Sequence, residues 1–137
     1  MRRRTKAREC ALKILYAVDI TKDEAQDCIK NFWDNHDTVN SEIKKFADYL
    51  VTGTCKNKNL IDNLISKCAT NWQIQRMAAI DRNIIRMATF ELLFAEDIPP
   101  KVSINEAVEI AKRYGDKDSN KFVNGVLDKI NKQECKK

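Results

Sequence analysis

Apolar residues recur every three or four positions along most of the chain, and this spacing restricts the fold more than any other feature. The clearest stripe consists of Ile43, Phe46, Ala47, Leu50, Val51 and Cys55. Residues at this spacing share one face of an α-helix, whereas a strand needs alternation with a period of two, which no stretch shows. Only three glycines and two prolines interrupt the 137 residues. The pattern predicts an all-α bundle of about six or seven helices in one domain, residues 1–137.

The first half of the chain divides into four predicted helical segments. The first covers about residues 4–18, and a capping box at Thr21–Glu24 is expected to open the second. After a polar break, residues 43–55 and 60–68 continue the helical period, with a kink or turn between them. Residues 71–96 are apolar nearly all round, which predicts a helix that is buried on most sides and central.

Turn and cap signals divide the last third of the chain. Two adjacent prolines at positions 99 and 100 cannot continue a helix and predict a break. A second capping box at Ser103–Glu106 is expected to open the next helix, and Gly115 to end it. Asp118 is a candidate N-cap for the last helix, and residues 133–137 are expected to form a disordered tail.

The positive charge of the chain is confined to its head. Residues 1–18 hold one acid, Glu9, and six cations, so the other 119 residues hold 19 cations and 19 acids. The six cations are Arg2, Arg3, Arg4, Lys6, Arg8 and Lys13. Each cation at a helix N-terminus is disfavoured by about 0.3–1 kcal/mol unless an anion lies against it. Residues 1–8 are therefore expected to be either a solvated, fraying terminus or a basic arm that binds phosphate.

The choice of arginine over lysine favours the second interpretation of the arm. Guanidinium groups bind phosphate through two hydrogen bonds and stack on bases, which a solubility tail does not need. An N-terminal arm can follow a flexible strand, so single-stranded RNA is more plausible than a duplex.

Catalytic chemistry has no support in the sequence. The five cysteines are an odd number without a C-x-x-C pair, and with the one histidine, His36, they match no zinc spacing. Unpaired thiols on apolar helical faces indicate a reducing compartment, such as the cytosol. His36 is expected in a polar loop without nearby partners, and no glycine-rich loop or membrane-length apolar run occurs. We therefore predict no enzyme, no catalytic residue, no cofactor, no metal site and no membrane contact.

Residues 115–130, "GDKDSNKFVNGVLDKI", form a second candidate site. Phe122 continues the apolar stripe of the last helix. The pattern is equally consistent with a core residue and with a partly exposed ring on which a base could stack. Gly125 costs about 1 kcal/mol against alanine inside a helix, which predicts close approach of another backbone. On the central helix, Arg82 and Arg86 are expected to be structural cations or to flank an interface. Their expected partners are Asp81 or Glu91.

Three segments together resemble one family, the NusB transcription antitermination factors. These segments are "RRRTKARECALKILYAVD", "WQIQRMAAIDRNIIRMATFELL" and "IPPKVSINEAVEIAKRYGDKDSNKFVNGVLDKI". The resemblance implies an all-helical, cytoplasmic bacterial protein that binds the boxA element of nascent RNA together with NusE, a small-subunit ribosomal protein. The resulting complex helps RNA polymerase to read through terminators, notably in ribosomal RNA operons. The resemblance leaves a homodimer possible.

The resemblance also implies roles for individual residues. Arg4, Lys6 and Arg8 match the family's arginine-rich RNA motif, although Thr5 and Lys6 interrupt the arginine run that is common there. With their neighbours in the same segments, the candidate RNA-binding residues are Arg2, Arg3, Arg4, Lys6, Arg8, Asp118, Lys121 and Phe122. The candidate NusE-facing residues are Tyr16, Asp81 and Arg82. The alternative is a non-enzymatic helical protein-interaction adaptor whose basic N-terminus is incidental.

Overall fold

The computed structural model describes residues 2–36 and 40–134. In these ranges the chain forms seven α-helices and one 3-10 turn, with no strand, which confirms the predicted all-α fold. The residues group into two compact units, 1–56 and 57–137. None of the described helices is both long enough and apolar enough to cross a bilayer.

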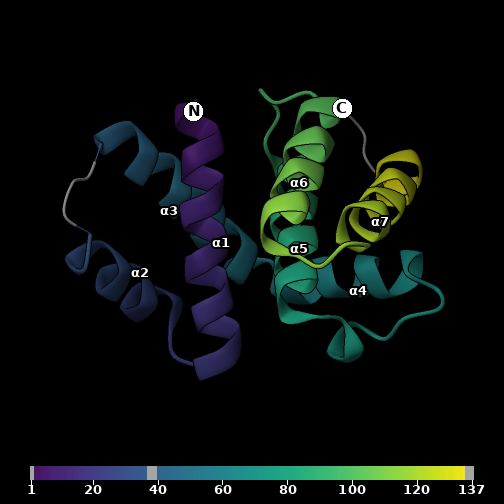
Figure 1. The fold of residues 1–137 in the computed structure, drawn as a ribbon, viewed down its shortest axis with the longest axis horizontal. Helices are drawn as coiled ribbons and strands as arrows, with labels where there is room; N and C mark the ends of the chain where they lie inside the picture. The colour runs from purple at the N-terminus through teal and green to yellow at the C-terminus, as the bar shows by residue number, and fades with distance from the viewer. Residues whose placement is uncertain (1, 37–39, 135–137) are drawn as a thin grey trace. The chain divides into compact units, whose positions relative to one another are not determined.

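The first unit consists of α1 (Arg3–Thr21), α2 (Ala25–Asp34) and α3 (Ser41–Lys56), with α2 and α3 both packed against α1 (Figure 1). A hydrogen bond of 2.7 Å from the Trp33 indole to the Asp48 carboxylate links α2 to α3. The predicted apolar stripes of α1 and α3 are largely buried, although Ile43, Phe46 and Cys55 are only half-buried. The buried residues include Ala7, Ala11, Ile14, Ala47, Leu50 and Val51.

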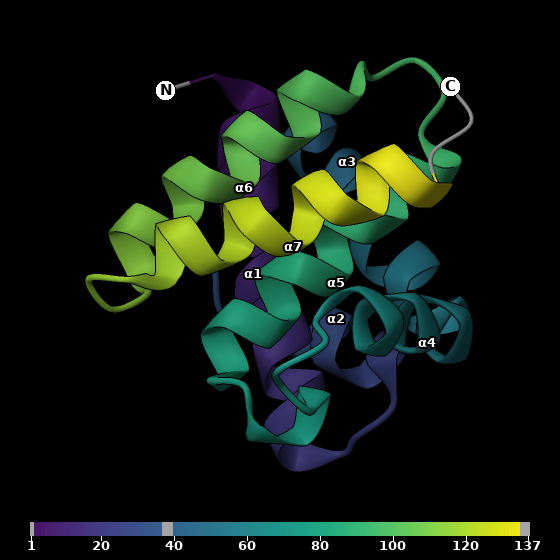
Figure 2. The same ribbon diagram turned by 90° about the vertical axis from the view of Figure 1, so that its right-hand side faces the viewer.

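The second unit is arranged around α5 (Ala79–Phe94), which contacts α4 (Lys58–Cys68), α6 (Pro100–Tyr114) and α7 (Ser119–Glu134) (Figure 2). Most residues of α5 are buried, which confirms the prediction of a central helix. That helix is shorter than predicted. The 3-10 turn η1 (Ile74–Arg76) precedes it, and residues 71–73 lie in a connecting segment.

Both predicted capping boxes are wrong. Thr21 is the last residue of α1, and its hydroxyl donates to the Ala17 carbonyl at 2.8 Å; α2 begins only at Ala25. Ser103 lies inside α6, where its hydroxyl donates to Glu91 Oε1 at 2.8 Å. The helix begins instead at Pro100, since proline fits the first helical position, where its missing N–H is not needed. Gly115 does cap the end of α6, as predicted.

One polar partner of α5 was not among those expected. Arg86 forms a bidentate ion pair with Asp62 of α4, through Nε at 2.8 Å and Nη2 at 3.0 Å. A nearly buried guanidinium needs such a partner, but nothing in the spacing of the sequence singled out Asp62. Gly125 was expected to meet another backbone, yet a Cβ added there would meet nothing within 4 Å.

The histidine, the cysteines and the C-terminal end differ in how well they match the predictions. His36 is not isolated, because its ring lies 4.1 Å from that of Phe32, centroid to centroid, and Nδ1 is 3.2 Å from the Phe32 carbonyl oxygen. Cys10, Cys28 and Cys68 are buried free thiols, as predicted, and Cys135 lies outside the described residues. Of the expected tail 133–137, the first two residues belong to α7 and the other three lie outside the described part.

Candidate nucleic-acid interface

The N-terminal end of α1 carries exposed cations and no acid in its first turn. Arg2 occupies the N-cap position without a side-chain cap bond, and Arg3, Arg4 and Lys6 are exposed. The first N–H groups of a helix have no partner inside it and, with the helix dipole, attract anions. Cations and free N–H groups at the same end therefore form a surface suited to phosphate.

Contacts with α3 fix part of this surface. Arg3 pairs with Glu42, an exposed ion pair. The Arg4 guanidinium lies 4.5 Å from the centre of the Phe46 ring, and that of Arg8 lies 5.4 Å from it. Arg8 differs from its neighbours because it is only 3% exposed. Its guanidinium is thus placed for packing beside Phe46, in contrast to its predicted role as a direct RNA contact.

The second predicted patch lies at the start of α7. Asp118 and Lys121 are exposed, whereas Phe122 is half-buried and meets the ring of Trp72 edge-on, with centroids 6.0 Å apart. Trp72 itself is 54% exposed. Phe122 is therefore neither a fully buried core residue nor a free platform. It forms part of an aromatic pair that reaches the surface.

A cavity of about 300 Å³ lies beside this aromatic pair. Three acids line it together with one cation, Arg76. The acids are Asp81, Asp116 and Asp118. The structure thus brings Asp81, predicted to face a protein partner, to the same cavity as Asp118 and Phe122, which were predicted to face RNA.

Asp81 is the buried member of this group, at 8% exposure. Its Oδ1 has no hydrogen-bond partner among the described residues. Burial raises the pKa of the Asp81 carboxyl above its ordinary value, the Asp116 charge raises it further, and a hydrogen bond from the Ser119 hydroxyl lowers it. The same hydroxyl lies 3.2 Å from Asp116 Oδ1, so its single proton can serve only one carboxylate at a time.

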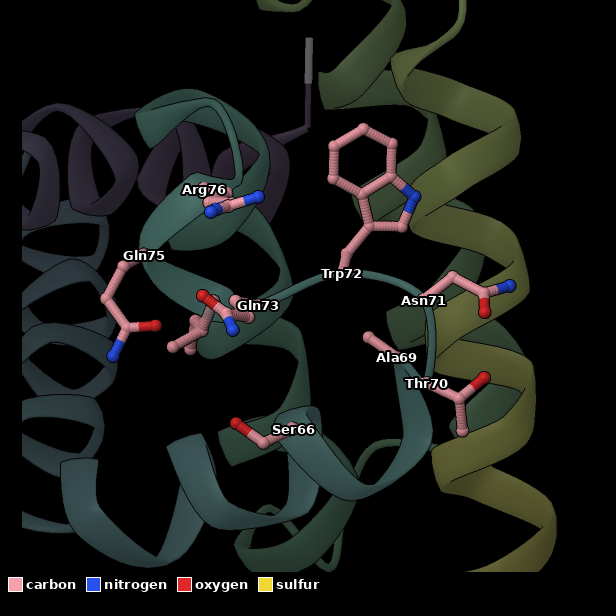
Figure 3. A pocket seen from close by; sticks show the side chains of 9 residues that line it. Ser66, Ala69, Thr70, Asn71, Trp72, Gln73, Gln75 and Arg76 are labelled. Carbon is pink, nitrogen blue, oxygen red and sulfur yellow. The ribbon is translucent and has the colours of Figure 1, made fainter.

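A larger hollow of about 800 Å³ adjoins the cavity, since Trp72 and Arg76 line both. It lies along the segment from α4 to η1, and its other polar side chains are neutral (Figure 3). In Figure 3 the Trp72 ring extends away from Ser66, on the same side as the Arg76 guanidinium. The neutral polar residues that line the larger hollow are Ser66, Thr70, Asn71, Gln73 and Gln75.

The predicted partner-facing residues fall in different places. Tyr16 is 40% exposed on α1. Arg82 is directed at backbone, because its Nη1 donates to the Ile74 carbonyl at 3.2 Å and to the Met77 carbonyl at 3.1 Å. Arg82 therefore holds the turn before α5, the segment that also carries Arg76.

Six residues that line the cavity were not among the predicted site residues: Trp72, Arg76, Met77, Ala78, Asp116 and Ser119. Trp72 did have a usable signal, since a large aromatic residue in the polar stretch "ATNWQ" has no helical stripe to join. Ser119 gave no such signal. Its contact with Asp81 depends on how α7 packs against α5, which local patterns do not report.

The geometry defines a class of protein: an all-helical chain with a basic helix terminus and a separate aromatic and acidic cavity, which suits binding more than catalysis. Comparison with known proteins makes this specific. The chain matches the model of the NusB family over residues 5–132. It therefore belongs to the NusB family.

Relatives and solved structures agree with this assignment. The chain is 45% identical to the transcription antitermination protein NusB of Thermodesulfovibrio yellowstonii, over 96% of this chain and 93% of the relative. A structure of T. maritima NusB superposes with a TM-score of 0.89 at 38% identity, covering 98% of this chain and 94% of that one. A chain from a crystal structure of the antitermination factors NusB and NusE in complex with dsRNA superposes at 0.87 with 30% identity, covering 96% and 98%.

Proposed function

We propose that this protein is a non-enzymatic transcription antitermination factor that binds boxA-type RNA together with NusE. The observation that carries the proposal is the first turn of α1, where Arg2, Arg3, Arg4 and Lys6 are exposed at a helix N-terminus that lacks acids. Such a cluster stabilises a polyanion through charge and through bidentate guanidinium–phosphate contacts. By its family, the protein would act in the bacterial cytoplasm, in an assembly with RNA polymerase that reads through terminators, notably in ribosomal RNA operons.

The relatives support both proposed partners. One structurally similar chain comes from a complex of NusB, NusE and double-stranded RNA. For the present chain, the N-terminal cations suit an unpaired strand, which can bend so that its phosphates follow the turn of the helix. We therefore infer that single-stranded RNA is the preferred ligand, with Asp118, Lys121 and Phe122 as a second contact region.

A protein partner needs a surface of its own, and Tyr16 is the candidate with the clearest support. It is exposed on α1, and tyrosine is enriched at protein interfaces. Arg82 would support the NusE interaction indirectly, since its guanidinium already binds the carbonyls of residues 74 and 77.

Binding titrations of a fluorescent boxA-like RNA test the proposal. The chain alone and the chain with recombinant NusE are each titrated with the RNA as a single strand and as a duplex. We expect specific binding of the single strand that tightens when NusE is present, and weaker binding of the duplex. A Tyr16→Ala variant should lose most of the NusE effect while it retains the affinity of the chain alone for RNA.

The alternative is a protein-interaction adaptor with an incidental basic head. It predicts NusE binding of normal strength and no difference between boxA-like RNA and a scrambled RNA of equal length. That result would contradict the proposed function.

A further inference from the structure

One face of α3 is exposed, opposite the apolar stripe that the same helix buries. Its residues recur three or four positions apart, so they are neighbours along the helix. From first to last they extend over about 16 Å, since each helical residue adds about 1.5 Å. These residues, the α3 row, are Lys45, Tyr49, Thr52 and Lys56, and all four are exposed. The row thus presents two cations and one aromatic ring, and it contains no acid.

An aromatic column joins the α3 row to the basic head of α1. The Arg4 guanidinium lies 4.5 Å from the centre of the Phe46 ring, and the Tyr49 ring is stacked on that of Phe46. The two ring centroids are 6.0 Å apart, and the ring planes differ by 29°. Phe46 is half-buried, whereas Tyr49 is 43% exposed. The column therefore starts at an arginine of the proposed RNA site and ends at a ring that solvent reaches.

The acids of α3 do not neutralise the lysines of the row. The helix contains two acids, and each of them pairs with a cation outside the row. Glu42 pairs with Arg3, and the Asp48 carboxylate lies 2.8 Å from the Lys44 ammonium. The positive charge of the row is therefore available to a polyanion from solution.

Two kinds of polyanion could lie along the row, a nucleic-acid strand or an acidic segment of a protein. Tyr49 favours the strand, because an unpaired base stacks on an exposed aromatic ring and every base has such a face. Position also favours the strand, because RNA bound at Arg4 meets positive charge again along α3. A stacked strand advances about 3.4 Å per phosphate, so a row of about 16 Å can accompany about five nucleotides.

We propose that the α3 row binds the RNA strand where it continues beyond the head of α1. The Tyr49 ring stacks on an unpaired base, and Lys45 and Lys56 lie beside phosphates. Phe46 is a positioning residue, since its ring contacts both the Arg4 guanidinium and the Tyr49 ring. The inference rests on the proposed RNA-binding function and extends the site from α1 to α3.

Substitution of Tyr49 tests the stacking contact. The full chain and its variants are titrated with a fluorescent boxA-like single strand and with fluorescent heparin, a polyanion without bases. Tyr49→Ala should bind the RNA about tenfold more weakly and heparin with unchanged affinity, because only the stacked base loses its partner. Tyr49→Phe keeps an aromatic ring and should retain the affinity for RNA. Thermal melting shows that each variant is folded.

Substitution of the two lysines tests the phosphate contacts. Lys45→Gln combined with Lys56→Gln should flatten the slope of the logarithm of the association constant against the logarithm of salt concentration by about 1.4. Each phosphate neutralised on a single strand contributes about 0.7 to this slope. The matched control combines Lys101→Gln with Lys112→Gln, which removes two exposed lysines of α6 at the same spacing. The control should keep the slope of the unaltered chain.

Three outcomes would overturn the inference. If the unaltered chain binds the RNA, unchanged affinity in Tyr49→Ala or an unchanged slope in the double lysine variant would refute the α3 row and leave the proposed function intact. Normal RNA affinity with weaker NusE binding in Tyr49→Ala would assign this face to a protein partner. Failure of the unaltered chain to bind boxA-like RNA would refute both the inference and the proposed function.

Discussion

At the scale of single residues, exposure separates side chains that the sequence alone treats alike. Arg4 and Arg8 both lie over the Phe46 ring, but Arg4 is exposed and Arg8 is 3% exposed. Phe122 and Val126 share a helical stripe, yet only Val126 is fully buried. The spacing of a sequence gives the face of a helix, whereas the depth of each residue on that face depends on its tertiary neighbours.

Phe122 should contribute more to RNA binding than to folding. In Phe122→Ala we expect a loss of unfolding free energy below the roughly 3–5 kcal/mol typical of a fully buried phenylalanine, because the ring is half-buried. The affinity for RNA should fall by about 1–3 kcal/mol, the usual contribution of a base stacked on an aromatic ring. Urea denaturation and RNA titration of the same samples measure the two quantities. A large loss of stability with unchanged RNA affinity would make Phe122 a core residue.

Asp81 should make the stability of the protein depend on pH. Burial raises the pKa of its carboxyl in the folded state, so the folded protein holds this proton to higher pH than the unfolded chain. The contribution of Asp81 to the free energy of unfolding therefore falls as pH rises from about 4, the usual aspartate pKa, through the raised value. Asp81→Asn should remove this fall. The free energy of unfolding of the variant, compared with that of the unaltered protein, should therefore be more favourable at pH 7 than at pH 4. A stability difference between the two proteins that is the same at both pH values would show that Asp81 is not desolvated.

At the scale of helices, local sequence patterns predicted which segments form helices better than they predicted where each helix begins and ends. The 3–4 spacing located every helical stripe, and the proline pair marked the break before α6, because both signals act within a few residues. The predicted box at Ser103 failed because its hydroxyl has a distant partner, Glu91, that no local rule contains. The box at Thr21 failed because α1 extends through that residue. The same limit applies to the candidate site. The basic head was visible as a run of charges, whereas the cavity joins residues 72, 81 and 119, which only packing brings together.

Gly115→Ala and Gly125→Ala should have opposite effects on the stability of the protein. A Cβ at Gly115 would lie 2.3 Å from Ser119 Oγ and 2.9 Å from the Ala111 carbonyl oxygen, so Gly115→Ala must displace the start of α7. We expect a loss of about 1–3 kcal/mol, as for other overpacked sites. Gly125 lies in open space inside α7, and Gly125→Ala should raise stability by up to about 1 kcal/mol through helix propensity. Chemical denaturation of both variants would contradict this account if Gly125→Ala were the more destabilised of the two.

At the scale of the whole molecule, the net charge of +5 comes from one segment of the chain. The first 18 residues hold all of the excess, and the rest of the chain is balanced. Such an asymmetry directs a polyanion to one end of α1, and its contribution should weaken as salt concentration rises. Arg8, although counted in that charge, is buried and should contribute to folding more than to this field.

The salt dependence of RNA binding tests the central claim most directly. If four to six phosphates of a single strand are neutralised, the logarithm of the association constant should fall against the logarithm of salt concentration with a slope of about −3 to −4. Replacing the four exposed cations Arg2, Arg3, Arg4 and Lys6 with glutamine should flatten this slope by about 3 with helicity unchanged, whereas Arg8→Gln should leave the slope as it is and lower the melting temperature. An unchanged slope in the fourfold variant would contradict the claim that the head of α1 binds the RNA backbone.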